Sequence, residues 1–328
     1  MEKTESAVHE EPTMCTKKEK IGHAIGVLGH DSAYTLWAMW MTPFLTDIVQ
    51  LPAAILGGLL AFGRVFDGVN DIMMGSIADR TRSKFGRFRP WLLWAGPLFC
   101  LCMALSFLIP SPNMTVRIIY ACVMYVVVDV VFTAVDIPFW SLPAAMTRNI
   151  KERSAIIGST QTTSNTITGI IGIVMPLALV AFGGAGSASA YFTLAAIVAV
   201  FATMYLISFK LVKEHVVPED SEKFSLKLGI KSVVTNRPLL LVQIANAVGL
   251  LAMIMRGTFN YYYCQYNLGS LEVMSVLSLL GTVVGIPGCL SFVALSKKVD
   301  KKKVIIFFSG LYIAACLVQY FAGWGNLI

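Results

Sequence analysis

Apolar stretches of about 20 residues, separated by short polar connections, make up most of the chain. A helix of about 20 residues crosses ~30 Å of hydrocarbon at 1.5 Å per residue, so each stretch is long enough to span a bilayer. The pattern predicts an all-α polytopic membrane protein with about nine transmembrane helices. We expect them at residues 22–49, 53–78, 91–110, 117–146, 154–182, 188–209, 238–266, 270–295 and 304–325.

The composition supports this class of protein. Hydrophobic residues make up 56% of the 328 positions and charged residues only 14%, with a mean hydropathy of +0.70. The net charge of +7 does not indicate nucleic-acid binding, because the basic residues recur between apolar stretches and form no aromatic-interleaved patch. The seven cysteines form no CxxC pair and no Cys/His cluster, so we predict no disulfide framework and no cysteine metal site. The predicted environment is a lipid bilayer.

The basic residues also predict the orientation and the domain boundaries. Of the 26 Lys and Arg residues, 23 lie in the N-terminal tail and in every second connection, which indicates a cytoplasmic N-terminus in the cell membrane. The one long connection is charged and separates six predicted spans from three. We expect a cytoplasmic tail at 1–20, an N-terminal six-helix bundle at 21–209, a cytoplasmic linker at 210–237 and three helices of a C-terminal bundle at 238–328. Because transporters with two six-helix halves follow this plan, we expect the second bundle to be truncated.

The second predicted span carries three formal charges on one helical face. Arg64, Asp67 and Asp71 are spaced i, i+3 and i+7, with Asn70 beside them. Each charge costs about 2.5 to 3.5 kcal/mol at the bilayer centre, so a functional site is the preferred interpretation. The alternative is a structural Arg–Asp pair that joins helices.

Two other predicted spans place acids at a similar depth. Asp31 in the first span and Asp136 in the fourth lie, like the two acids of the second span, about 10 to 18 Å from the cytoplasmic ends of their helices. Transporters bind their cargo near the midplane at helix interfaces, which favours one shared site. Asp129, Thr133, Asp136 and Trp140 share one face of the fourth span, and the role of Asp129 stays open.

The chemistry of this face suits a sugar. An indole packs on the apolar C–H face of a sugar ring while hydroxyl groups donate to a carboxylate, although Trp140 is also placed where interfacial belt residues occur. His30 precedes Asp31 and is either a hydrogen-bonded helper or a proton relay. Gln161 begins a polar run in the fifth span that either lines a cavity or serves helix packing.

Two motifs resemble a known family. The segment GSIADR at 75–80, followed by Arg82, Gly86 and Arg87, resembles the loop signature of the major facilitator superfamily. The longer ADRTRSKFGRFRPW at 78–91 and VDIPFWSL at 135–142 are similar to the glycoside-pentoside-hexuronide:cation symporter family, typified by the melibiose carrier. The resemblance implies a major facilitator fold of twelve helices, alternating access and sugar uptake driven by a monovalent cation. Residues 21–160 carry the similarity most strongly.

The resemblance also implies roles for individual residues. Four positions match the cation site of the family: Asp67, Asn70, Asp71 and Thr133. Asp31, Asp136 and Trp140 match positions that hold the sugar. Where the melibiose carrier has a sugar-contacting Lys, Tyr and Arg, this chain has His30, Phe132 and Gln161, so the identity of the sugar is open.

The coupling cation is Na+ or H+. Carboxylate, amide and hydroxyl oxygens are suitable ligands for sodium, whereas two carboxylates one helical turn apart can also carry a proton. Asn70 favours sodium, because its amide oxygen adds a ligand that exchanges no proton. No other cofactor is expected.

Charged residues at the predicted cytoplasmic ends are candidates for a gate. We expect charge pairs between the 79–80 segment and the 148–153 segment to latch the inner side, in a network of Arg64, Asp79, Arg80, Arg148 and Arg153. Simple topology anchoring is the alternative for the basic loop.

The sequence thus predicts a monomeric cation:sugar symporter and no enzyme, because no nucleophile–base constellation, phosphate loop or nucleotide motif occurs. One alternative is an inactive truncated carrier or a carrier-derived membrane sensor. Another is a symporter of lipid-like or other organic solutes.

Overall fold

The protein is helical throughout the part that a computed structural model describes, which comprises residues 14–184, 186–216, 235–296, 299 and 301–322. Most of the predicted tail and of the predicted linker lies outside these residues. The first set of helices comprises α1 (Lys17–Pro43), α2 (Ala53–Arg80), α3 (Arg89–Ser106), α4 (Met114–Met146), α5 (Ile150–Ala181), α6 (Ala188–Ala199) and α7 (Ala202–Leu211). The second set comprises α9 (Arg237–Tyr262), α10 (Glu272–Ser296) and α11 (Lys301–Ala322). Two π-helical turns, η1 (Phe44–Ile48) and η2 (Tyr263–Asn267), continue α1 and α9.

Helices long and apolar enough to cross a membrane account for most of the fold. Six qualify on length and hydropathy within the described residues: α2, α3, α4, α5, the combined α6–α7 segment, and α9 with η2. Helices α1, α10 and α11 have 27, 25 and 22 residues, which also suffices in length. The prediction of an all-α polytopic membrane protein is therefore confirmed.

The sixth predicted span differs from the expectation of one continuous helix over 188–209. It is interrupted at residues 200–201, between α6 and α7, where Val200 and Phe201 N–H groups bond to carbonyls three residues earlier. The Phe201 carbonyl lies against α1, where a Cβ built on Gly29 would approach its oxygen to 2.7 Å. This close approach of the two backbones accompanies the interruption, and apolarity alone does not predict it.

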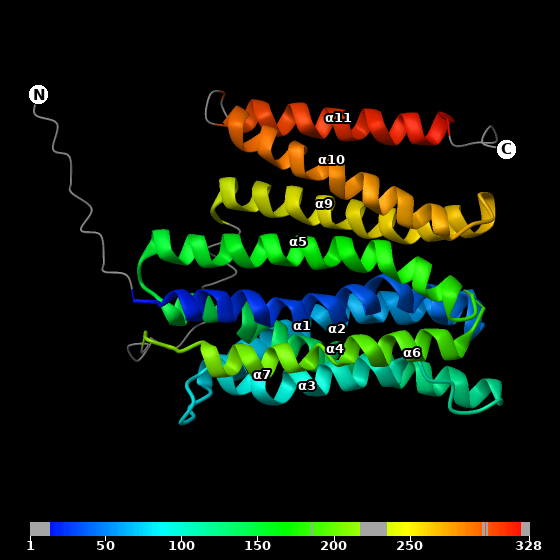
Figure 1. Cartoon of the computed structure of the whole chain (residues 1–328), viewed down its shortest axis with the longest axis horizontal. Helices are drawn as coiled ribbons and strands as arrows, with labels where there is room; N and C mark the ends of the chain where they lie inside the picture. The colour runs from blue at the N-terminus through cyan, green and yellow to red at the C-terminus, as the bar shows by residue number, and fades with distance from the viewer. Residues whose placement is uncertain (1–13, 185, 217–234, 297–298, 300, 323–328) are drawn as a thin grey trace, which may run out of the picture.

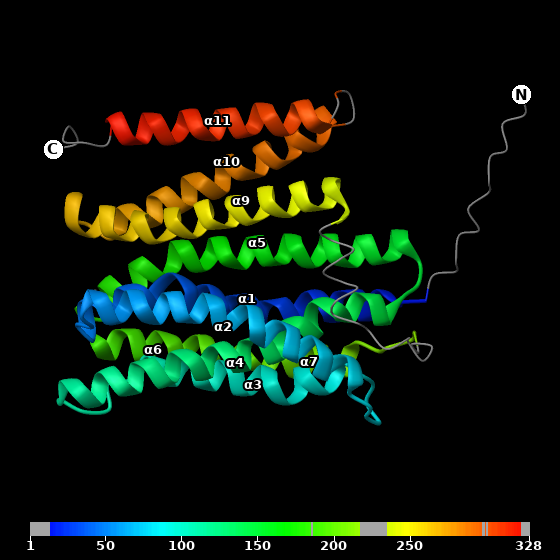
Figure 2. The same cartoon turned by 180° about the vertical axis from the view of Figure 1, so that it is seen from behind.

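The helices stack in two sets that α5 joins (Figure 1). Helices α1 to α7 form one bundle, and α9, α10 and α11 lie beyond α5 on the side away from α3 and α7, as the reverse view also shows (Figure 2). Helix α10 packs directly on α5. The second set is thus attached to the first chiefly through α5 and, at one end, through α1.

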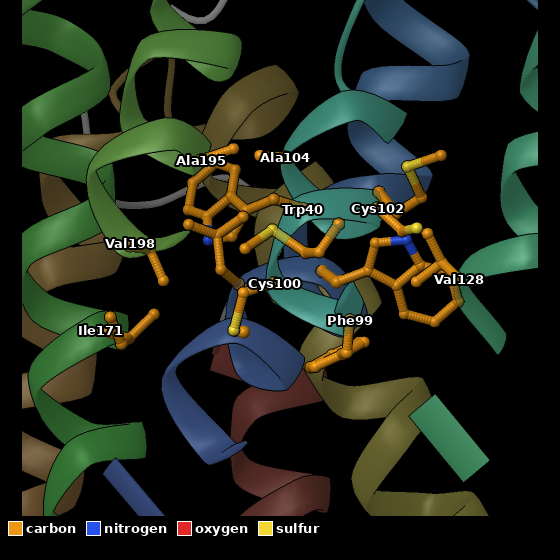
Figure 3. Packing of buried hydrophobic residues seen from close by; sticks show 14 of the residues in the cluster. Trp40, Phe99, Cys100, Cys102, Ala104, Val128, Ile171, Ala195 and Val198 are labelled. Atoms are coloured by element: carbon orange, nitrogen blue, oxygen red, sulfur yellow. The ribbon is translucent and has the colours of Figure 1, made fainter. Parts of the chain in front are cut away.

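Large apolar side chains fill the first bundle. Trp40 of α1 and Phe99 of α3 are fully buried, and they belong to one cluster with small residues such as Cys100, Ala104 and Ala195 (Figure 3). Since lipid is as apolar as this core, tight packing rather than exclusion of water holds such helices together.

Glycines allow α1 to approach α7 closely. Gly22, Gly26 and Gly29 follow one face of α1, and a Cβ at Gly26 would lie 2.7 Å from Ser208 Oγ. Small residues at helix interfaces let backbones come together in this way.

The segment after α7 folds back on the first bundle. The Glu214 carboxylate accepts the backbone N–H groups of Arg87, Phe88 and Arg89 at 2.8 to 2.9 Å. These are otherwise unsatisfied donors at the start of α3, and a carboxylate is favoured there by the helix dipole.

Candidate functional site

A histidine bridges two of the predicted acids. His30 Nδ1 lies 2.6 Å from Asp31 Oδ1 on α1, and His30 Nε2 lies 3.0 Å from Asp136 Oδ1 on α4. The His30 side chain is 2% exposed, whereas that of Asp136 is 32% exposed. The ring therefore joins two helices through one buried side chain, and one of the two acids stays accessible.

Aromatic rings surround this bridge. His30 stacks on Phe139, with ring centroids 5.0 Å apart, and meets the edge of Trp140 at 6.3 Å. Phe132 lies 5.3 Å from His30 and stacks on Tyr34 at 4.3 Å. The predicted sugar residues His30, Phe132, Asp136 and Trp140 are therefore brought together, with apolar ring faces beside a carboxylate, as sugar binding requires.

The predicted cation residues lie between α2 and α4. Thr133 of α4 lies near the Asp71 carboxylate of α2 across this interface. Asp67, one turn earlier, pairs with Arg64, whose Nη1 lies 3.3 Å from Asp67 Oδ2. Asn70 Nδ2 is buried without a hydrogen-bond partner. Asp67 and Asp71 thus face different partners.

Asp129 joins the same group, although the sequence left its role open. It is 8% exposed, and its Oδ2 atom is buried without a partner. Its carboxyl group lies near the Asp67 carboxyl group. Two neighbouring carboxylates repel unless a cation or a proton lies between them. Its i−4 spacing from Thr133 is the sequence signal that identifies it.

The acids of the two subsites are close enough to interact. Asp67 and Asp136 both act electrostatically on Asp71. Within the described ranges, no three His, Cys, Asp or Glu side chains converge closely enough to hold a metal ion by themselves. The donor set is instead mixed: carboxylate, hydroxyl and amide oxygens, which fit a weakly held monovalent cation as transported cargo.

Gln161 lies apart from the histidine bridge. Its Nε2 donates to Asn165 Oδ1 at 3.3 Å, and both side chains are exposed on α5. One turn further, the hydroxyl groups of Thr168 and Thr35 are 3.2 Å apart, which links the polar run of α5 to α1. The structure therefore places Gln161 on an accessible polar face.

The charged residues of the basic loop do not form the pairs that we expected between the 79–80 and 148–153 segments. Asp79 pairs with Arg87 of its own loop instead of the 148–153 segment. Arg80 and Arg148 are exposed. Arg153 Nη2 donates to the Thr147 carbonyl at 3.2 Å. The predicted latch between the 79–80 and 148–153 segments stays a prediction.

A second buried histidine was not identified from the sequence. His23 Nδ1 lies 2.8 Å from Thr160 Oγ1, and Nε2 lies 3.1 Å from the Phe139 carbonyl oxygen. Both partners are uncharged, unlike those of His30. His23 therefore connects α1 to α4 and α5 without an ion pair.

An acidic residue outside the predicted spans carries a shifted pKa. Burial alone would raise the pKa of Glu19, but hydrogen bonds from Thr16 and from His215, whose Nε2 lies 2.7 Å from Glu19 Oε1, hold it below its ordinary value. Glu19 also completes the capping box that starts α1.

Comparison with known proteins identifies similar sequences. The profile of the family described as "MFS/sugar transport protein" matches residues 22–328. The uncharacterized symporter YjmB of Bacillus subtilis is 28% identical over 92% of this chain and 67% of its own length. The putative glycoside/cation symporter YagG of Escherichia coli is 28% identical over 94% and 66%, and the isoprimeverose transporter of Lactiplantibacillus pentosus is 28% identical over 83% and 57%. The chain spans about two thirds or less of the length of these relatives.

Proposed function

The chain belongs to the MFS/sugar transport protein family, and on this premise we propose that it is a secondary active carrier that moves a glycoside, pentoside or hexuronide together with a cation by alternating access. Proteins of this family are transporters and not enzymes, in agreement with the sequence analysis. The carrier is a multi-pass membrane protein, and we expect it to act as a monomer in the cell membrane with a cytoplasmic N-terminus.

The histidine bridge is the observation that carries the proposal. The two ring nitrogens of His30 contact Asp31 and Asp136 on opposite sides, so one imidazole ring holds both carboxyl groups in place. Asp136 keeps exposed oxygen atoms that accept sugar hydroxyls, and Trp140 offers the adjacent ring face. Asp31 and Phe132 belong to the proposed sugar site, and Gln161, on the accessible polar face of α5, is a further candidate for contact with the sugar.

The proposed cation site lies next to it, between α2 and α4. Asp67, Asn70, Asp71 and Thr133 supply the oxygen atoms, and we add Asp129 because its buried carboxyl group faces Asp67. A cation bound at Asp71 lowers the negative charge that Asp136 experiences. Occupation of one site therefore alters the electrostatics of the other, which is the requirement for coupled transport.

Sodium is the preferred coupling ion in this proposal. Thr133 and Asn70 add neutral oxygen atoms that exchange no proton, and sodium requires several such ligands. A proton held between Asp67 and Asp129 is the competing arrangement.

Uptake into membrane vesicles tests the proposal. A sodium gradient should drive accumulation of a labelled glycoside, and Asp71→Cys should abolish it. Glu272→Gln, which neutralises an exposed carboxylate at the start of α10, is the matched control and should transport normally. A proton gradient that drives uptake without sodium would identify H+ as the coupling ion. Sugar binding without accumulation under either gradient would contradict the carrier and favour a sensor.

A further inference from the structure

The ends of α1 and α9 meet through hydrogen bonds between the two sets of helices. The Tyr261 hydroxyl donates to Asp47 Oδ2 at 2.9 Å, and the Tyr266 hydroxyl donates to Asp47 Oδ1 at 3.1 Å. The hydroxyl groups of Thr46 and Tyr262 are 3.1 Å apart. We name these five side chains the Asp47 clasp. One carboxylate is its centre, because it accepts hydrogen bonds from two tyrosines at once.

The two helix ends that form the clasp have the same backbone design. After η1 the N–H groups of Val49 and Leu51 bond to carbonyls five and six residues earlier, and those of Leu268 and Ser270 repeat this pattern after η2. Each turn then contains one residue with positive φ, at 59° for Gln50 and 65° for Gly269. A non-glycine residue seldom adopts this conformation, so the turn at Gln50 is held by its surroundings. The clasp therefore joins two structurally equivalent elements, as the repeats of a carrier would.

The clasp is also where α9 is buried. Among the α9 side chains that the structure describes, only Tyr261 is buried, with 1% exposure, and its ring lies 5.4 Å from that of Trp40 on α1. Cys264 in η2 is fully buried as well. The other α9 side chains that the structure describes are exposed or partly exposed, so the described part of this helix is held against the first bundle at one end.

We propose that the Asp47 clasp is a gate on the membrane side opposite the N-terminus, closed in this structure and broken whenever that side opens. The charge distribution predicts this side to be the exterior. Helix α10 packs on α5, so the two sets of helices stay joined when the clasp separates. The inference rests on the proposed carrier function, because a carrier must open each side in turn.

Chemical labelling of Cys264 tests the gate. A membrane-impermeant maleimide is added outside sealed right-side-out vesicles that contain the full chain, and mass spectrometry follows the adduct on the Cys264 peptide. We expect Asp47→Asn to raise the labelling rate about tenfold or more, because it removes a charged acceptor from two hydrogen bonds. Tyr266→Phe removes a single hydroxyl from an exposed ring and should raise the rate about threefold or more.

Tyr120→Phe is the matched control. The Tyr120 hydroxyl donates to the Leu105 carbonyl at 2.8 Å, within the first bundle and on the same predicted side of the membrane. It should leave the Cys264 rate unchanged. Cys15 lies near the N-terminus, on the predicted cytoplasmic side, and should stay unlabelled by the reagent added outside.

Two results would overturn the gate. One is labelling of Cys264 at the wild-type rate in both clasp variants, even if their melting temperature falls, because that pattern identifies a static contact. The other is an equal increase in Tyr120→Phe, which indicates general loosening. The labelling measurement requires no sugar and no ion gradient, so it can be interpreted even if the protein takes up no sugar. The uptake experiment can likewise be interpreted even if the labelling result contradicts the gate.

Discussion

Replacement of His30 by glutamine is expected to weaken sugar binding by about 100-fold. In the wild-type protein the imidazole ring separates the oxygen atoms of Asp31 and Asp136, with contacts of 2.6 and 3.0 Å on its two sides. Those oxygens are therefore ~7 Å apart, and two unshielded charges at that distance repel by about 2 kcal/mol at an effective dielectric constant of 20. Glutamine is uncharged and cannot compensate both acids.

The expected magnitude is the cost of breaking a buried ion pair, which includes this repulsion. Removing one partner of a fully buried ion pair costs about 3 to 5 kcal/mol. We take the lower limit, about 3 kcal/mol, because the Asp136 side chain is 32% exposed and water screens part of its charge. That energy corresponds to a factor of about 100 in affinity.

Calorimetric sugar binding by the purified protein, with thermal unfolding in parallel, measures the effect. His23→Gln is the matched control, because His23 is equally buried on α1 and also stacks on Phe139, but its hydrogen-bond partners are Thr160 and a carbonyl oxygen and carry no charge. His30→Lys places a cation between the two acids and should recover part of the affinity. Equal sugar affinity in His30→Gln and wild type, or equal losses in the two glutamine variants, would refute the reasoning.

Three further predictions concern packing and the ends of helices. Gly26→Val should lower the free energy of unfolding by about 1 to 3 kcal/mol, because its Cβ would lie 2.7 Å from Ser208 Oγ. Gly68→Val is the control, because a Cβ there meets no atom within 4 Å, and thermal unfolding should show little change. Glu214→Ala should cost about 1 to 3 kcal/mol by releasing three N–H groups at the start of α3, and Glu214→Gln should recover part of this. In the folded protein the pKa of Glu19 lies below its ordinary value of 4.5. The stability that ionised Glu19 contributes is therefore present above pH 4.5 and is lost as the pH falls through the folded pKa. Glu19→Gln should reduce this loss of stability at acid pH, as measured by thermal unfolding at a series of pH values.

The sequence predicted the helices well because hydrocarbon imposes a fixed length on every apolar span. The structure places α2 at Ala53–Arg80 against an expected 53–78, and α4 ends at Met146 as expected. The shared face of Asp67 and Asp71 was equally predictable, since helical spacing alone determines it.

Features that depend on contacts between helices were not predictable in the same way. Gly22, Gly26 and Gly29 occur at interface spacing, but only the position of α7 shows what they accommodate. Asp47 lies at the end of an apolar span, where a charged residue is ordinary, and its tyrosine partners are more than 200 positions away. Such pairings arise from the tertiary arrangement and leave no local signal.

Sugar-dependent entry of labelled sodium into vesicles tests the central proposal most directly. With sodium equal on both sides, an inward gradient of the transported glycoside should drive sodium inward. Asp71→Cys should abolish this movement and His30→Gln should reduce it. Sugar that enters without any accompanying movement of sodium or protons would contradict coupled transport.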